Sequence, residues 1–251
     1  MSSSDRFLGR AEVYAAARPT YPAALREWLR ERNLLTAAAD IGAGTGLFTQ
    51  LLLEGGAQVS AVEPNADMRA QLAGRLSPAV QSGQLHVLAG SSEATGLADH
   101  AVDLVTAAQA AHWFDPERTV REFRRILTPG GLVLLVWNDW RGEHTPFNVA
   151  YGQTITRFYR DGDDPVHINR VPEDEIPLFM PGGHEKRTFE NPLQLNRERL
   201  QALAGSISYL PHPTDPLHAP MTRALDDLFD AHQQQGQVTL HYRTHAFLGR
   251  V

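Results

Sequence analysis

The sequence predicts an α/β fold, a doubly wound sheet of seven strands with helices on both faces. Short apolar runs alternate with helical segments through the first half of the chain, which is typical of βαβ crossovers and a mostly parallel sheet. The runs are continuously apolar, which indicates strands that are buried on both faces. A glycine-rich turn at 42–46 follows the first run, at the edge where open α/β sheets bind ligands.

Each early element has its own signal. An amphipathic helix is predicted at about 22–32, since proline stands at its start and its large apolar residues share one face. The apolar run 37–41 is predicted to be a strand that stops at a glycine. The helix that follows, 46–54, ends at the glycine pair 55–56, and the run 58–63 is the second predicted strand.

The alternation continues to the middle of the chain. A helix is predicted to run to about residue 75, and strands are predicted at 84–89 and 102–108. Another helix is predicted at about 116–127. A Pro-Gly-Gly turn then leads into the run 132–137, the most strand-like segment of the chain.

The segment after the fifth strand differs in composition. Residues 142–183 are polar and rich in Asp, Pro and aromatic residues. We interpret about 141–183 as a substrate lid or insert in a single domain of residues 1–251, whose ligand-binding core is about 34–138. The elements predicted for the second half are a helix at 146–159, a strand at 185–195, helices at 198–207 and 219–234, and a final antiparallel edge strand at 237–248.

Composition and charge exclude several classes of function. The formal net charge is -6, whereas a nucleic-acid-binding surface needs clustered Lys and Arg, so no nucleic-acid partner is expected. Because the chain has no cysteine, disulfides, thiol catalysis and cysteine-based zinc sites are excluded, and no histidine spacing predicts a metal. The first residues lack the layout of a signal peptide, and no apolar run approaches the about 18 residues of a membrane span. We expect a cytoplasmic protein without a membrane partner, a monomer or a homodimer.

The glycine turn can hold a ligand that carries adenosine. Gly42, Gly44 and Gly46 let a ligand approach the backbone and its N–H groups. Glu63 stands about 20 residues further on, at the end of the second strand, where an acid can accept both hydroxyls of a ribose. These features alone leave nicotinamide, flavin and S-adenosylmethionine open.

The details of the turn favour S-adenosylmethionine. A dinucleotide fingerprint has the spacing G-x-G-x-x-G, whereas the pattern here is G-x-G-x-G, with leucine at position 47. Asp40 would place a negative charge near a bound pyrophosphate, but it suits a ligand that has an ammonium group and no phosphate. Thr45 can donate a hydrogen bond to the carboxylate of such a ligand.

With these motifs the chain resembles the class I S-adenosylmethionine-dependent methyltransferases, in the broad group called methyltransferase type 11. The resemblance covers about residues 8–138, and it implies a Rossmann-like sheet with the strand order 3-2-1-4-5-7-6. The matching motifs are Asp40–Gly46, Val62–Asn65 with Met68, Gly90–Ala94 through Asp103–Val105, and Leu127–Leu132. The stretches Tyr14–Pro22 and Ala111–Asp115 are similar to a subgroup that includes trans-aconitate methyltransferase-like proteins.

The resemblance also implies roles for residues around the turn. Pro64 and Met68 would flank the adenine, and the glutamate before them would bind the ribose. Ser92 and Glu93 would meet the adenine edge, and Gln109 would lie near the methionine portion. The predicted cofactor-binding residues are Tyr14, Arg18, Asp40, Gly42, Ala43, Gly44, Thr45, Glu63, Pro64, Met68, Ser92, Glu93 and Gln109.

His112 is the predicted catalytic residue, because it follows the fourth strand at the ligand edge and could be a general base for a hydroxyl or amine. A carboxylate acceptor is already ionised and needs a cation instead, for which Arg18, Arg141, Arg157 and Arg160 are candidates. The leading prediction is therefore an enzyme that methylates a small molecule at oxygen, specifically at a carboxylate. The alternatives are a methyltransferase-like protein that binds cofactor without catalysis and a nicotinamide-dependent oxidoreductase.

Overall fold

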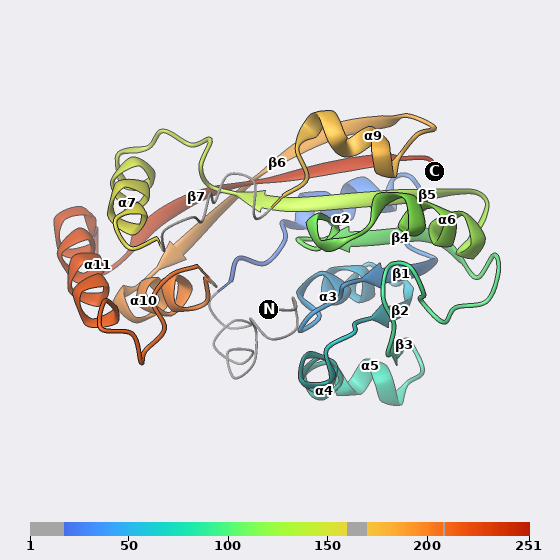
Figure 1. Cartoon of the computed structure of the whole chain (residues 1–251), viewed down its shortest axis with the longest axis horizontal. Helices are drawn as coiled ribbons and strands as arrows, with labels where there is room; N and C mark the ends of the chain where they lie inside the picture. Colours follow the sequence, from blue (N-terminus) through green and yellow to red (C-terminus); the bar gives the residue numbers. More distant parts are fainter. Residues whose placement is uncertain (1–17, 160–169, 208) are drawn as a thin grey trace. The chain divides into compact units, whose positions relative to one another are not determined.

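The computed structural model describes residues 18–159, 170–207 and 209–251. Its strands form one seven-stranded sheet in the order β3-β2-β1-β4-β5-β7-β6, which confirms the predicted α/β fold and strand order (Figure 1). The strands are β1 (Ala37–Ile41), β2 (Gln58–Val62), β3 (Leu85–Leu88), β4 (Val102–Ala108), β5 (Leu127–Asp139), β6 (His184–Leu195) and β7 (Val238–Gly249).

Helices alternate with the strands as the sequence predicts. The α-helices are α2 (Ala23–Arg30), α3 (Leu47–Glu54), α4 (Ala66–Arg75), α5 (Ser77–Gln81), α6 (Pro116–Ile126), α7 (Pro146–Thr156), α9 (Ile176–Phe179), α10 (Arg197–Gly205) and α11 (His218–His232). Two 3-10 helices are η2 (Ala111–Trp113) and η3 (Glu173–Glu175). The helices α5 and α9 have no counterpart among the predictions, because helices of 5 and 4 residues are too short to show a helical period.

The described residues divide into two compact units, which we call unit 1 and unit 2. Unit 2 contains Thr20–Trp137, residues 170–189 and Thr244–Val251. Unit 1 contains residues 18–19, 138–159, 190–207 and 209–243. Strands β6 and β7 therefore contribute residues to both units. A single domain with a lid at about 141–183 stays a prediction.

Strands β1 to β5 pair in parallel and bury both faces of the sheet in unit 2. Strand β1 pairs with β2 and β4, β2 pairs with β3, and β4 pairs with β5. Neighbouring residues of β1 enter two different clusters: Ala38 packs with apolar residues of α2 and α3, and Ala39 packs with those of α6 and α9. Since successive strand residues face opposite sides, continuous apolar runs are what a doubly covered sheet requires.

Strand β5 begins earlier than predicted. The sequence places a turn at 129–131 before the strand, but the strand starts at Leu127, which pairs with Val102. The next pair is Leu132 with Leu104, so β5 accommodates extra residues at this point as a bulge. Backbone pairing on both sides of the Pro-Gly-Gly segment makes it part of the strand.

The last two strands are antiparallel neighbours. The side chain of Thr188 contacts that of His245, and Thr239 donates a hydrogen bond to Gln194. The contact positions advance along β6 while they retreat along β7, which is the pattern of an antiparallel pair. The sheet is therefore mixed, and the final strand is antiparallel as predicted. The prediction that it lies at the edge is wrong, because β7 lies between β5 and β6, and β6 is the edge strand.

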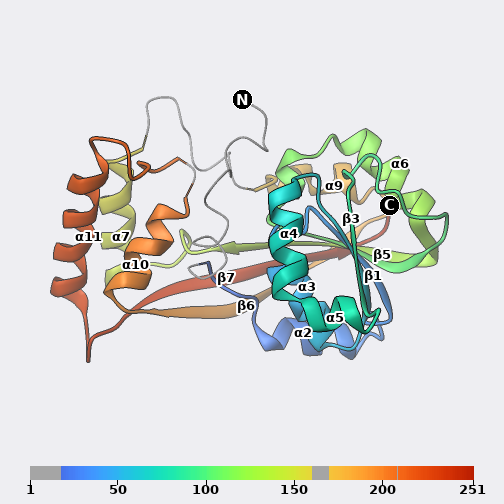
Figure 2. The ribbon, with the colours of Figure 1, turned by 90° about the horizontal axis from the view of Figure 1, so that it is seen from below.

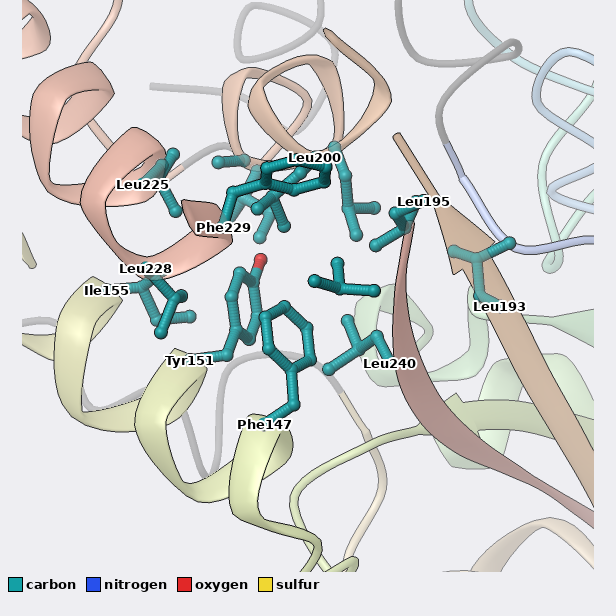
Figure 3. Close-up of a cluster of buried hydrophobic side chains, with 14 of the residues drawn as sticks. Phe147, Tyr151, Ile155, Leu193, Leu195, Leu200, Leu225, Leu228, Phe229 and Leu240 are labelled. Carbon is teal, nitrogen blue, oxygen red and sulfur yellow. The ribbon is translucent and has the colours of Figure 1, made fainter. Parts of the chain in front are cut away.

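Unit 1 has a core of its own. Helices α7, α10 and α11 bury apolar side chains against the ends of β6 and β7 (Figures 2 and 3). Tyr151 of α7 and Leu240 of β7 are fully buried there. The rings of Trp140 and Tyr151 meet edge to face with centroids 5.1 Å apart. This contact connects the residue that follows β5 to α7.

Candidate functional site

The candidate site lies in unit 2, at the carboxyl ends of β1, β2 and β4. The turn after β1 is tied to β2, since the N–H of Gly42 donates to the carbonyl of Val62 at 2.9 Å. Gly42, Gly44 and Gly46 all have positive φ angles, of 68°, 55° and 83°, a region that side chains of L-residues rarely enter. Glycine at these positions is therefore a backbone requirement of the turn.

The first and third glycines are also fixed by close packing. A Cβ at position 42 would lie 2.7 Å from the Cβ of Ala110, and one at position 46 would lie 2.8 Å from Cγ of Leu72. Position 44 is different, because a Cβ there would meet nothing within 4 Å. The turn thus packs its two outer glycines against protein and leaves its middle one facing open space.

Glu63 is held in place by the backbone on both sides. Its Oε2 accepts the N–H of Gly44 at 2.9 Å, and its Oε1 accepts the N–H of Asn65 at 2.9 Å. Burial raises the pKa of this carboxyl, while the hydrogen bonds from Asn65 and Gly44 and the nearby charge of Arg69 act in the opposite direction. Each oxygen keeps lone-pair capacity for a further donor, as a pair of ribose hydroxyls requires.

Asp40 is the centre of a buried network. Thr49 of α3 donates to its Oδ2 at 2.6 Å, and Thr106 of β4 donates to its Oδ1 at 3.0 Å. Burial raises the pKa of Asp40 to about 6, although both threonine hydrogen bonds lower it. These two hydrogen bonds connect β1 to α3 and to β4. A contact between Asp40 and the ammonium of a ligand stays a prediction.

Thr45 carries a polar atom without a protein partner. Its side chain is 2% exposed, and its hydroxyl oxygen is buried and makes no hydrogen bond. A buried polar group without a hydrogen bond costs about 1–3 kcal/mol of stability. Such a group often marks a place where a ligand completes the hydrogen bonding. A carboxylate oxygen of S-adenosylmethionine would accept this hydrogen bond, so the turn fits that cofactor.

Two further segments frame the site. Asn65 caps α4 by accepting the N–H groups of Asp67 and Met68, which places the buried Met68 side chain in the first turn after the exposed Pro64. The predicted adenine-edge residues are a buried Ser92 and a partly buried Glu93.

The loop that carries Ser92 and Glu93 is anchored to α6. Glu122 accepts hydrogen bonds from the N–H and the hydroxyl of Thr95, at 2.8 and 2.6 Å, and it forms an ion pair with Arg125. Hydrogen bonds from Arg125, together with those from Thr95, lower the pKa of Glu122 to about 2.

The segment after β4 contains Gln109 and His112. Gln109 has a φ of 56°, an unfavourable conformation for a residue with a side chain, and its N–H donates to Val136 at 2.8 Å. Strain of this kind is typical of functional sites. His112 lies in η2, and its Nδ1 is buried without a hydrogen-bond partner. Burial lowers the pKa of His112 to about 4, so its ring is neutral at physiological pH.

The structure places the predicted residues in different parts of the chain. The turn, the glutamate, the adenine-edge residues, Gln109 and His112 all belong to unit 2. Arg18 and Arg141 belong to unit 1, where Arg157 is exposed. Tyr14 and Arg160 lie outside the described residues.

Sequence reasoning missed the residues that support the site. Thr49, Thr106 and Arg75 hold the turn through side-chain contacts, and Arg75 donates to the carbonyl of Thr45 at 3.1 Å. The only signal in the sequence is a threonine inside an apolar helix and another inside an apolar strand. Within the described parts of the chain, no helix could cross a membrane and no group of three acidic or histidine side chains could hold a metal ion.

A doubly wound sheet with a glycine turn after its first strand and an acid after its second is typical of nucleoside-binding α/β proteins. A family model described as a methyltransferase domain matches residues 39–135. An uncharacterized methyltransferase of Mycobacterium tuberculosis is 41% identical over 155 residues, which are 60% of this chain and 58% of that protein. An uncharacterized methyltransferase-like protein of Schizosaccharomyces pombe is 28% identical over 241 residues, covering 93% of this chain and 91% of that protein.

A solved structure has the same fold as this chain. A candidate type II methyltransferase from Anaeromyxobacter dehalogenans has the same fold, with a TM-score of 0.69 and 23% identity over 93% of this chain and 97% of that chain. Residues 39–135 are therefore similar to a methyltransferase domain, and the chain shares its fold with this solved structure. The alignment with the Mycobacterium tuberculosis protein covers less than two thirds of that relative. A likeness to trans-aconitate methyltransferase-like proteins stays a prediction.

Proposed function

We propose that this chain transfers the methyl group of S-adenosylmethionine to an oxygen atom of a small molecule, and specifically to a carboxylate. One combination of features supports S-adenosylmethionine as the methyl donor. The Glu63 carboxylate is fixed by the N–H of Gly44, the neighbouring Thr45 has a buried hydroxyl without a hydrogen bond, and position 44 faces open space. The glutamate suits ribose hydroxyls and the threonine suits a carboxylate. A dinucleotide would instead bring a pyrophosphate to this turn.

The cofactor supplies an activated methyl group on a sulfonium, so the protein must bind, align and exclude water. An acceptor oxygen contributes a lone pair to the new C–O bond, and the electrons of the broken C–S bond stay on sulfur. A carboxylate acceptor gives a neutral methyl ester, and no proton has to leave. An alcohol acceptor would need a base.

His112 supports the carboxylate reading. Its pKa of about 4 makes the neutral ring a weak base, which suits an acceptor that is ionised before it binds. Its buried Nδ1 without a partner remains suited to a hydrogen bond with the acceptor or the cofactor. We propose that His112 orients the acceptor through this atom.

Two measurements test the function. Calorimetry of the full chain with S-adenosylhomocysteine and with NAD tests the donor, and we expect binding of the first only. Incubation with S-adenosylmethionine and a pooled set of metabolites, followed by mass spectrometry, identifies any methylated product. Binding of NAD without binding of S-adenosylhomocysteine would overturn the proposal in favour of an oxidoreductase. Binding of S-adenosylhomocysteine without any methylated product would favour a cofactor-binding protein that does not catalyse.

A further inference from the structure

Helix α4 is connected to both segments of the candidate site through two of its arginines. Arg69 donates from Nη1 to the carbonyl of Glu63 at 2.7 Å and to that of Pro64 at 2.8 Å. Arg75, in the last turn of the same helix, donates from Nε to the carbonyl of Thr45 at 3.1 Å. All of these residues belong to unit 2, so the contacts lie within one compact unit.

Arg75 is held from a second side as well. Its Nη1 donates to Oε1 of Gln50 at 2.6 Å, and Nε2 of Gln50 donates to Oε1 of Glu54 at 2.8 Å, both in α3. A guanidinium group is planar and rigid, so hydrogen bonds from two of its nitrogens fix its orientation. Arg75 therefore connects the end of α4 to the glycine turn and to the helix that follows the turn.

The turn also packs against α4. A Cβ at Gly46 would lie 2.8 Å from Cγ of Leu72 and 3.3 Å from Nη2 of Arg75. Leu72 is fully buried, so the turn cannot move toward the helix at this point. The packing at Gly46 and the hydrogen bond to the Thr45 carbonyl act on neighbouring residues. Together they orient the residue whose buried hydroxyl has no hydrogen bond.

Arg69 acts on the other segment in two ways. Its hydrogen bonds hold two successive carbonyls at the point where the chain leaves β2 and turns into α4. Burial raises the pKa of Glu63, and the positive charge of Arg69 opposes that rise, which favours the carboxylate form. Arg69 thus fixes the backbone from which the Glu63 side chain extends and supports its charge.

The exposure of the two arginines separates positioning from global stability. Arg75 is exposed and Arg69 is partly buried, whereas Thr45 and Glu63 are buried. Charged side chains near the surface contribute little to the free energy of unfolding. Ligand binding is more sensitive, because it depends on how well the binding groups are oriented before the ligand arrives. The main effect of these hydrogen bonds is therefore expected at the ligand.

We propose that Arg69 and Arg75 are positioning residues for the methyl donor, each for a different part of it. Arg69 orients Glu63 for the ribose, and Arg75 orients Thr45 for the carboxylate of the amino-acid portion. Neither arginine has to contact the donor. This inference rests on the donor part of the proposed function, and it assigns to one helix the positioning of both parts of the ligand.

Two ligands distinguish the two roles in calorimetry of the full chain. S-adenosylhomocysteine carries the ribose and the amino-acid carboxylate, whereas 5′-methylthioadenosine lacks the amino-acid portion. Arg75→Met should weaken binding of S-adenosylhomocysteine at least about fivefold and leave that of 5′-methylthioadenosine unchanged. Arg69→Met should weaken both ligands by a similar factor, because both carry the ribose. Arg121→Met removes an arginine of α6 whose side chain is 61% exposed, and this control should leave both affinities unchanged.

A double variant tests whether Arg75 acts through Thr45. If it does, Thr45→Val combined with Arg75→Met should bind S-adenosylhomocysteine about as weakly as Thr45→Val alone. Thermal unfolding checks that each variant is folded. Arg75→Gln cannot span from the turn to Gln50, so it should bind like Arg75→Met and replaces that variant if the methionine variant does not fold.

Equal weakening of both ligands in Arg75→Met would show a general structural role and overturn the inference, as would an unchanged affinity for S-adenosylhomocysteine. Additive losses in the double variant, or a folded Arg69→Met variant that binds both ligands like the parent, would also overturn it. A parent chain that binds neither ligand would refute the donor part of the proposed function together with the inference. The expected affinities without any methylated product would refute the transfer reaction alone and support the positioning role.

Discussion

The carboxylate of Glu63 accepts a hydrogen bond from the backbone N–H of Gly44 at 2.9 Å, which joins the end of β2 to the turn after β1. The second oxygen accepts from Asn65, so the side chain is oriented before a ligand arrives. A fixed acceptor loses little freedom on binding, and this preorganisation strengthens the interaction with a ribose. The same bond makes the shape of the turn depend on the residue at position 63.

Glu63→Gln tests this relationship. An amide has one acceptor oxygen and cannot accept both backbone N–H groups and two ribose hydroxyls. We expect the affinity for S-adenosylhomocysteine to fall by about 1–3 kcal/mol, measured by calorimetry. The control is Glu117→Gln on α6, whose side chain is 83% exposed and which should leave affinity unchanged. A folded Glu63→Gln variant with the affinity of the parent would refute the ribose role.

Thr45→Val separates ligand binding from stability. The hydroxyl of Thr45 has no protein partner, so its removal should leave the free energy of unfolding unchanged or raise it, while the affinity for S-adenosylhomocysteine falls. Urea unfolding and calorimetry on the same samples measure the two quantities. A variant that loses stability and keeps its affinity contradicts the assignment.

Thr49→Val is the matched comparison within the same helix-and-turn segment. Its hydroxyl donates to the buried Asp40 at 2.6 Å, so its removal leaves a carboxylate oxygen without that partner. We expect the free energy of unfolding to fall by about 1–3 kcal/mol. Unchanged stability would show that Asp40 finds another donor.

The lowered pKa of His112 predicts that the protein loses stability in mild acid. Its pKa is lowered to about 4, so between about pH 6.5 and 4 the unfolded chain binds a proton that the folded chain does not. Its contribution to stability is complete above pH 6.5 and is lost as the pH falls toward 4. His112→Gln should flatten the stability profile in this window, measured by urea unfolding at several pH values. His86→Gln, at an exposed position of β3, should leave the profile as it is.

The lowered pKa of Glu122 predicts a second loss of stability at lower pH. Its pKa is lowered to about 2, with hydrogen bonds from Arg125 as the first cause, so its stabilisation is present above about pH 4.5 and is lost as the pH falls toward 2. Glu122→Gln should lower stability at pH 7 by about 1–3 kcal/mol and reduce the further loss below pH 4.5. Chemical denaturation at pH 7 and pH 3 measures both effects. Equal losses in parent and variant between these pH values would contradict the ion-pair explanation.

The sequence was informative where local pattern and burial act together. Continuous apolar runs identified β1, β2 and β4 because both faces of those strands are buried, and glycines marked the turn because its φ angles are positive. The bulge in β5 was missed, since a Pro-Gly-Gly segment has the local signal of a turn whether or not a neighbouring strand pairs with it. The short helices α5 and α9 were missed because they contain too few residues for a period.

The sequence by itself determined the fold class, the strand order through its resemblance to a family, and the ligand edge with its glycine turn and Glu63. Only the tertiary structure decided what holds that edge in place. Thr49 and Thr106 reach Asp40 from α3 and β4, and Glu122 reaches Thr95 across 27 positions of the chain. Arg141 likewise donates a hydrogen bond to Tyr209, 68 positions away in the chain. Periodicity and turn chemistry act over a few residues, whereas these hydrogen bonds depend on which distant side chains the packed sheet and helices bring within reach.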